Sequence, residues 1–233
     1  MLIIIRKKLV IVGLLFLSFI SALFFILQDS HAVFGDTIID TIIIDPGHGG
    51  NDPGAIGVSK TKEKDINLQV SLALKSKAEA LGFNIVMTRE TDVALYNDGS
   101  KNKKRSDLSN RKNSTENVEN AVFISIHMNK FEQESVKGAQ TFYSDREDSR
   151  ILAEYIQEEF RKTLDDNNRV AMQIPKSVYL LQNVHRPTVL VECGFLSNRG
   201  EEQLLSTDAY RNQIADCILN GVISFINKPE SLK

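Results

Sequence analysis

The sequence predicts an α/β fold in which a mostly parallel β-sheet carries helices on both faces. Strand-like runs alternate with helical segments along the chain, which is the pattern of a parallel sheet. The segment Ala121–Ile126 (AVFISI) is apolar apart from Ser125, as in strands that are buried on both faces. The roughly 200 residues that follow the N-terminal segment fit a single domain.

The predicted strands are short runs of β-branched and apolar residues. The first, Thr37–Asp45 (TIIDTIIID), ends where Pro46 and Gly47 interrupt the pattern. The remaining predicted strands follow at intervals: Phe83–Thr88, Ala121–Ile126, Gly138–Tyr143, Ser177–Leu181 and Thr188–Val191.

The predicted helices lie between and after these strands. Glu63–Leu81 ends at Gly82, because glycine favours the left-handed conformation that closes many helices. Asp107–Glu116 is shorter and more polar. In Ile151–Leu164 apolar residues recur every four positions and form one buried face, and Asp208–Ile226 is the last helix.

The N-terminus carries an export element. Leu9–Leu27 is an almost unbroken apolar run of 19 residues, and three basic residues precede it. The length approaches the ~20 residues of a membrane span and exceeds the ~7–15 of a signal-peptide core. Ser30-His31-Ala32, however, is an acceptable cleavage site, so signal peptide and uncleaved anchor both stay open. In either case the chain after about residue 33 crosses the membrane.

These boundaries give the predicted organisation of the chain. It consists of a signal peptide or membrane anchor (1–32), a linker with the start of the first strand (33–40), one folded domain (41–227) and a tail (228–233).

Charge and cysteine content narrow the function classes. With 28 basic and 30 acidic residues the net charge is −2, so a dedicated nucleic-acid-binding role is not expected. Cys193 and Cys217 cannot form a disulfide framework. Cys193 follows Glu192 in an extended segment, where neighbouring side chains point to opposite faces, so a buried small residue is a better interpretation than a nucleophile.

Reactive side chains follow three of the predicted strands. His48 lies three residues past Asp45, His127 comes directly after Ile126, and Glu192 directly after Val191. Ligands of parallel sheets bind beyond the carboxyl ends of the strands, so these residues are expected at one edge.

Glu63 is a fourth candidate, at the start of the helix that returns to the same edge. At ~100° per residue, and with Ile66 at zero, Glu63 falls near ~60° and within the apolar stripe, whereas Asp65 falls near ~260°. A buried carboxylate needs a partner. Two histidines, one glutamate and a water make an open catalytic zinc site, beside which Glu192 can transfer protons. The alternative, in which each histidine is structural, stays open.

The motifs then resemble one known family. IIIDPGHGGNDPGA, EKDINL, SIHMN and VLVECGFLSN, with MTRETD, Arg111 and GAQTFYS between them, resemble the zinc-dependent N-acetylmuramoyl-L-alanine amidases of the amidase-3 family. The resemblance implies a six-stranded α/β catalytic domain over 41–227. It implies that His48, Glu63 and His127 bind one Zn²⁺ and that Glu192 is the catalytic acid/base. The basic segment Asn97–Arg105 is longer than in many members and is interpreted as a solvated surface loop that alters the groove.

The implied activity is hydrolysis of the amide between N-acetylmuramic acid and L-alanine in peptidoglycan. The short layout with an apolar head resembles most the CwlD-type, germination-specific amidases, which implies a role in the spore cortex, where muramic δ-lactam forms. Expected partners are the peptidoglycan substrate, the membrane if the head is uncleaved, and an accessory lipoprotein or activator. A zinc carboxypeptidase acting on stem peptides and a catalytically silent wall-binding module are the alternatives. Arg89 is open between binding a substrate carboxylate and a structural ion pair.

Overall fold

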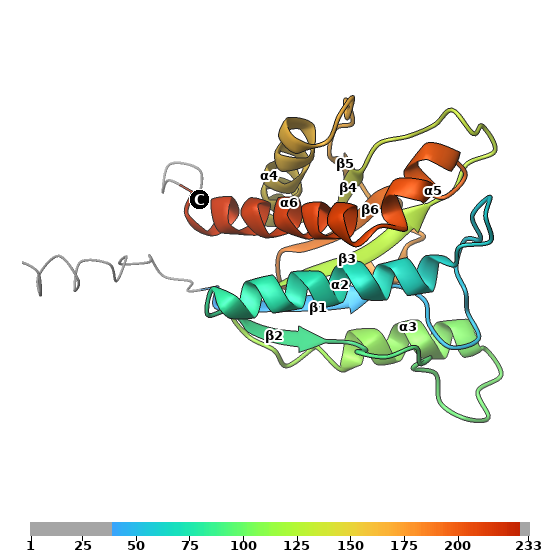
Figure 1. Cartoon of the computed structure of the whole chain (residues 1–233). Helices are drawn as coiled ribbons and strands as arrows, with labels where there is room; N and C mark the ends of the chain where they lie inside the picture. Colours follow the sequence, from blue (N-terminus) through green and yellow to red (C-terminus); the bar gives the residue numbers. More distant parts are fainter. Residues whose placement is uncertain (1–38, 229–233) are drawn as a thin grey trace, which may run out of the picture. The chain divides into compact units, whose positions relative to one another are not determined.

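A computed structural model describes residues 39–228 as a six-stranded sheet flanked by helices (Figure 1). The strand order is β2-β1-β3-β6-β4-β5. The strands are β1 (Thr41–Pro46), β2 (Asn84–Met87), β3 (Ala121–Asn129), β4 (Gln140–Tyr143), β5 (Met172–Gln173) and β6 (Thr188–Phe195). The helices are α2 (Glu63–Ala80), α3 (Lys103–Asn113), α4 (Glu147–Thr163), the 3₁₀ helix η1 (Tyr179–Leu181), α5 (Arg199–Leu205) and α6 (Asp208–Ile226).

The sheet is mostly parallel, as the sequence predicts. Neighbouring strands pair in parallel from β2 through β1 and β3 to β6. The exception is β4, which runs antiparallel to β6 and parallel to β5. The carboxyl ends of β1, β3 and β6 therefore meet at one edge of the sheet.

Alternation along the strands builds two cores, one on each face. Ile42 and Ile44 of β1 point into the larger core beneath α2, α4 and α6, whereas Ile43 points into the smaller one beneath α3 and η1. Figure 1 shows α2 and α6 side by side on one face of the sheet. The prediction of helices on both faces is confirmed.

One predicted strand is wrong, and one observed strand was not predicted. Ser177–Leu181 is not a strand; it is a turn followed by η1, which buries Leu180 and Leu181 in the smaller core. A short apolar run satisfies a strand and a buried turn equally well, so its pattern could not separate them. The sixth strand is instead β5, an exposed two-residue strand at the edge of the sheet. It has no alternation of apolar and polar residues from which it could be predicted.

Two helices differ from their predicted bounds. The basic segment Asn97–Arg105 is not loop throughout, because α3 begins at Lys103 and the Asn102 side chain caps it by accepting from the Arg105 amide at 2.9 Å. The helix α5 was not predicted; its N-cap is Asn198, whose side chain accepts from the Glu201 amide. At the end of α2, Gly82 (φ 88°) adopts the expected left-handed conformation.

The predicted export element and most of the predicted tail lie outside the described residues. Within residues 39–228, no helix combines the length and apolar character that crossing a bilayer requires.

Candidate metal centre

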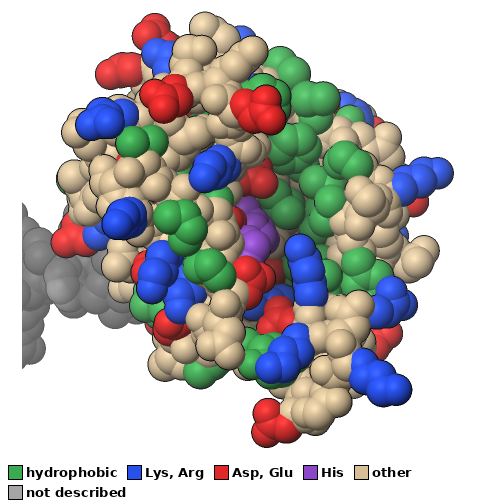
Figure 2. Space-filling model, turned by 90° about the vertical axis from the view of Figure 1, so that its right-hand side faces the viewer, with side chains coloured by type: hydrophobic (Ala, Val, Ile, Leu, Met, Phe, Trp, Pro, Cys, Tyr) green, Lys and Arg blue, Asp and Glu red, His purple; other side chains and the backbone are tan. Residues whose placement is uncertain are grey.

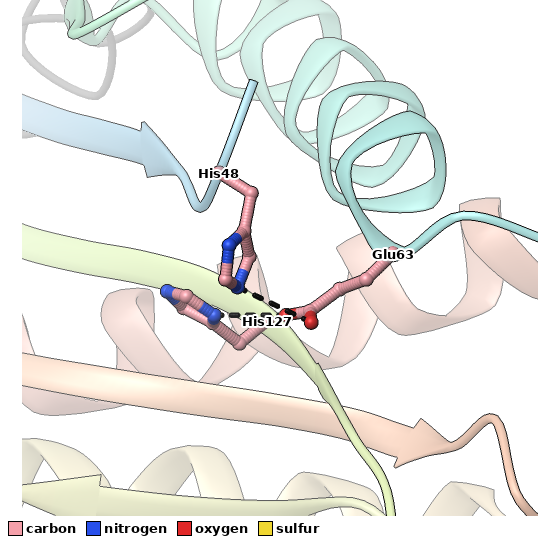
Figure 3. Close-up of side chains that lie close together, drawn as sticks. All are labelled: His48, Glu63 and His127. Carbon is pink, nitrogen blue, oxygen red and sulfur yellow. Dashed lines mark hydrogen bonds and ion pairs between the residues drawn. The ribbon is translucent and has the colours of Figure 1, made fainter. Parts of the chain in front are cut away.

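Four predicted site residues come from the sheet edge where β1, β3 and β6 end. His48 lies in the loop after β1, His127 near the end of β3 and Glu63 at the first position of α2. Glu192 of β6 is the register partner of His127. Figure 3 shows both imidazole rings turned toward the Glu63 carboxylate.

The distances show that three of these side chains converge. His48 Nε2 lies 3.2 Å from Glu63 Oε2, and His127 Nδ1 lies 2.9 Å from Glu63 Oε1. The two ring centroids are 5.0 Å apart, with the planes at 76°. One ligand atom from each residue fits within a 4.8 Å cluster. The predicted convergence of His48, Glu63 and His127 is therefore present.

Glu63 is buried, and the backbone around it fixes its carboxylate. Oε2 accepts from the Ala55 amide at 2.7 Å, and Oε1 accepts from the Met128 amide at 3.1 Å. Burial by itself opposes ionisation, but hydrogen bonds and charge from His127 and His48 hold the pKa of Glu63 well below its usual range. Asp65, two positions later, is exposed. The angular positions on the predicted helix thus correctly distinguished the buried Glu63 from the exposed Asp65.

Both the backbone and the side chain of His48 are fixed by their surroundings. Its backbone lies in the left-handed region (φ 61°), which is uncommon for a residue other than glycine. Its Nδ1 lies 2.9 Å from Asp52 Oδ2, which leaves Nε2 to face Glu63. Burial lowers the pKa of His48, but hydrogen bonds and charge from Glu63 and Asp52 outweigh it and raise the pKa. Asp52 thus has the geometry of an orienting residue.

A buried arginine holds the loop that carries His48. Arg111 of α3 donates from Nη2 to the His48 carbonyl at 2.5 Å and from Nη1 to the Pro46 carbonyl at 2.7 Å. The same Nη1 pairs with Asp45 at 2.8 Å, and Nε pairs with Asp107 at 2.6 Å. Burial disfavours the Asp45 anion, yet Arg111 and two hydroxyl donors keep its pKa below the usual value.

Arg89 is structural, but not as a member of an ion pair. Its guanidinium donates to four backbone carbonyls, those of Pro46, Gly47, Lys64 and Thr91, at 2.9–3.0 Å. All three guanidinium nitrogens donate hydrogen bonds to the protein and the residue is buried, so Arg89 is not placed to bind a substrate carboxylate. It instead ties the loop after β1 to the first turn of α2.

Two glycines make room for the predicted ligands. A methyl group added at Gly47 would lie 2.3 Å from the His127 ring, and one added at Gly54 would lie 2.5 Å from Glu63 Oε2. These contacts are shorter than side chains tolerate. Glycine at these two positions is therefore required by the packing of His127 and Glu63.

Glu192 is partly buried, with one carboxylate oxygen left without a partner. Oε2 is inaccessible and has no hydrogen bond within the described part of the chain. Burial raises the pKa of Glu192 to about 7, with His127 and His48 opposing and Glu63 adding to the rise. A carboxyl group with a pKa near neutrality can both accept and donate a proton, as an acid/base requires.

Cys193 is not a nucleophile in this arrangement. It is fully buried in the larger core, and burial raises the pKa of its thiol well above the usual value. Glu192, its neighbour, does not belong to that core. The interpretation as a small core residue is confirmed.

A groove of about 600 Å³ opens beside the centre. Figure 2 shows histidine side chains within a hollow, with hydrophobic side chains along one side and Lys and Arg side chains at its rim. The apolar wall comes from α3 and η1, and it includes Leu108, Val178 and Leu180. A cleft of this size can hold a peptide-like or sugar-like substrate.

The donor set fits zinc. Zn²⁺ accepts imidazole nitrogen and carboxylate oxygen, and catalytic sites use three protein ligands and leave one position open. His48, Glu63 and His127 supply three such atoms, and Glu192 lies alongside without being needed as a ligand.

Asp45, Asp52 and Arg111 have supporting positions that local sequence pattern did not predict. Asp52 could have been found, because it lies four residues after His48 in a Gly-rich turn. Asp45 ends an apolar strand, which indicates a buried acid in need of a cation. Nothing in the local pattern identifies Arg111 as that cation.

Comparisons with known proteins agree with this geometry. The family model described as N-acetylmuramoyl-L-alanine amidase matches residues 42–224. The germination-specific N-acetylmuramoyl-L-alanine amidase of Bacillus subtilis (strain 168) is 35% identical over 232 residues, 96% of this chain and 97% of the relative. The structure of the CwlD amidase from Clostridioides difficile, in complex with the GerS lipoprotein, has 43% identity and a TM-score of 0.77, covering 80% of this chain and 98% of that one.

A more distant solved structure shows the same fold. The catalytic domain of CwlV, an N-acetylmuramoyl-L-alanine amidase from Bacillus (Paenibacillus) polymyxa var. colistinus, is 29% identical, with a TM-score of 0.69 over 81% of this chain and 98% of that one. With the family model matching most of its length, this chain belongs to the N-acetylmuramoyl-L-alanine amidases and is an enzyme of that class.

Proposed function

We propose that the chain hydrolyses the amide between N-acetylmuramic acid and L-alanine with one Zn²⁺ held by His48, Glu63 and His127. The observation that carries the proposal is the convergence of these three donors within 4.8 Å at the mouth of a groove. When bound, Zn²⁺ would polarise the amide carbonyl and lower the pKa of a water to about 7.

Glu192 acts as the proton carrier in this proposal. It takes a proton from the attacking water as the new C–O bond forms. It then gives that proton to the leaving L-alanine nitrogen as the amide C–N bond breaks. Its support is the unpartnered Oε2 and the pKa raised to about 7. The backbone donors around Glu63 orient its carboxylate, and Asp52 orients the His48 ring.

The decisive experiment compares wild type with Glu192→Gln and His127→Ala on purified peptidoglycan. Mass spectrometry of the products identifies the bond that is cut, and metal analysis measures zinc. We expect Glu192→Gln to keep about one zinc per chain while losing at least about 10²-fold in kcat, the lower range for a general acid/base. His127→Ala loses both zinc and activity. Full activity in Glu192→Gln, or full zinc occupancy in His127→Ala, would refute the assigned role.

Product analysis also separates the alternative enzyme. An amidase releases an intact peptide from the glycan, whereas a carboxypeptidase releases a single terminal amino acid. A carboxypeptidase also needs a cation for the terminal carboxylate; neither Arg89 nor Arg111 can supply it, because both are engaged with the protein, so the products decide between the two enzymes. Retention of all four site residues argues against a silent wall-binding module.

The biological setting that we propose is the spore cortex. The support is the germination-specific relative, which this chain matches along nearly its whole length. Peptide removal there precedes muramic δ-lactam formation. The chain would act outside the cytoplasmic membrane, exported or anchored by residues 1–32. Its C. difficile relative is in complex with a lipoprotein, which supports an accessory lipoprotein partner for this chain. Loss of muramic lactam from the cortex of a deletion strain, restored by wild type but not by Glu192→Gln, tests the setting.

A further inference from the structure

The groove beside the metal centre carries two basic side chains that the proposed mechanism does not use. Lys103 and Lys104, in the first turn of α3, line the same cavity as His48 and His127. They belong to the basic segment Asn97–Arg105. Two lysines that face the groove beside the metal centre are candidates for binding an anionic group of a ligand.

The acidic side chains of the groove already have partners. Asp45 and Asp107 pair with Arg111, and Asp52 contacts the His48 ring. These contacts engage most of the negative charge of the groove, and Asp52 alone also interacts electrostatically with one of the two lysines, Lys104.

Among the described residues, Lys103 and Lys104 have no ion-pair partner of their own, and only Lys104 is close enough to a groove carboxylate, Asp52, to lower the pKa of that group, as the last and smallest of the causes. Both are exposed, and across residues 39–228 neither forms an ion pair. Lys103 Nζ lies 4.8 Å above the Tyr96 ring, which holds the ammonium at the groove without neutralising it. The first turn of α3 contains no acidic residue, so the helix dipole adds to the positive potential. Other lysines nearby are engaged; Lys112, for example, donates to the Gln182 carbonyl at 2.7 Å.

The apolar wall of the groove, built by α3 itself and the segment of η1, increases the effect of these charges. Leu108, Val178 and Leu180 line it with apolar surface. A cleft with one uncompensated sign of charge and low-dielectric walls focuses the potential onto a ligand. The peptide stem of peptidoglycan supplies the matching group, because beyond L-alanine it continues into a glutamate linked through its side chain, which leaves the α-carboxylate free.

We propose that Lys103 and Lys104 form a subsite for a stem-peptide carboxylate, so that the enzyme prefers stems with a free acid at the second residue over stems in which that group is a carboxamide. The inference rests on the proposed function, because it places the substrate peptide in the groove beside the metal centre. The lysines contact substrate and set specificity; they take no part in the proton transfers.

The test uses two synthetic muropeptides that differ only in the second residue, one with the free α-carboxylate and one with its carboxamide. Wild type is compared with the zinc-loaded Lys103→Gln/Lys104→Gln double variant. We expect KM for the acid substrate to rise about 3- to 10-fold, the range for two exposed charge pairs, with kcat nearly unchanged. KM for the carboxamide substrate stays within about twofold.

Two controls isolate the charge. Lys101→Gln removes an exposed lysine of the same segment that does not line the groove, and we expect it to leave both substrates unaffected. Lys103→Arg/Lys104→Arg keeps the charges and restores the preference. An equal rise in KM for both substrates, or no change for either, overturns the subsite.

A binding measurement separates this inference from the proposed function. Calorimetry with the two free stem peptides, acid and carboxamide, reports the preference without any turnover. If wild type cleaves neither muropeptide but binds the acid peptide more tightly through the lysines, the subsite stands and the proposed reaction falls. If wild type cleaves both yet binds the two peptides equally, the reaction stands and the subsite falls.

Discussion

The two histidines of the centre reach it by different routes. His127 belongs to β3, with backbone pairing on both sides of that strand, and Glu192 sits opposite it in β6. His48 lies beyond the end of β1, in a left-handed backbone conformation. The sheet alone positions the first two residues, whereas His48 depends on a separate scaffold.

That scaffold is a buried polar network. Arg111 and Arg89 hold the carbonyls of the loop after β1, and Asp45 anchors Arg111 while accepting from Thr88 at 2.6 Å and Ser125 at 2.7 Å. The ends of three strands and α3 thus meet at one carboxylate. His48 in its loop is therefore held as firmly as His127 in its strand. It is held by buried charged groups, and removing one of them would cost much of the folding free energy.

The largest effect is expected from breaking that network. Arg111→Ala leaves the Asp45 carboxylate buried without its cation, so the free energy of unfolding should fall by about 3–5 kcal/mol in denaturant titrations. Arg211→Ala is the matched control, since Arg211 is also buried but pairs with the exposed Asp208 and lies far along the chain from the centre. A loss at Arg111 no greater than that at Arg211 would contradict the comparison.

A second change tests whether the loop also constrains the strand-borne ligand. Gly47→Ala drives a methyl group into the His127 ring, so zinc affinity should fall about 10- to 100-fold in chelator competition, as for disturbed ligand orientation. Gly82→Ala is the control away from the centre. Its backbone is left-handed (φ 88°), unlike that of Gly47, and among the described residues no atom lies within 4 Å of an added methyl group, so it should reduce stability and leave zinc affinity unchanged. Equal zinc affinity in wild type and Gly47→Ala would show that His127 adapts.

A third test measures how the stability of the metal-free protein depends on pH when Glu192 is replaced. Because the pKa of Glu192 is raised to about 7, the folded state binds more protons than the unfolded state between about pH 4.5 and 7, and the side chain stabilises the fold less as pH rises through this window. The stability of Glu192→Gln relative to wild type should thus increase from pH 5 to pH 8 by about 1–3 kcal/mol. A pH-independent difference in unfolding free energy would place Glu192 in an ordinary, solvated environment.

The smallest effect is expected from the residue that orients the His48 ring. Asp52→Asn keeps the size of the side chain but removes the charge beside Nδ1, and zinc affinity should fall about tenfold with the fold intact. The measurement is zinc competition together with thermal unfolding. A larger loss here than in Gly47→Ala would mean that ring orientation, and not the room around the rings, limits metal binding.

The same contrast explains what could be foreseen in the fold. β3 and β6 are apolar on both faces, so their type, burial and catalytic ends follow from local pattern. Ser177–Leu181 lies at the rim, where a 3₁₀ turn buries the same leucines that a strand would. β5 is a two-residue edge strand that forms only by pairing with β4. Neither has a local signature.

The sequence by itself determined the alternating α/β order, the strand ends that carry His127 and Glu192, and the buried face of α2 that carries Glu63. These follow from residue periodicity, which any short window contains. Only the tertiary structure decided the left-handed turn at His48, its dependence on Arg111, and the opening of Lys103 and Lys104 into the groove. Those depend on contacts between residues as many as 66 positions apart, such as Arg111 with Asp45, and chain connectivity does not encode such distances locally.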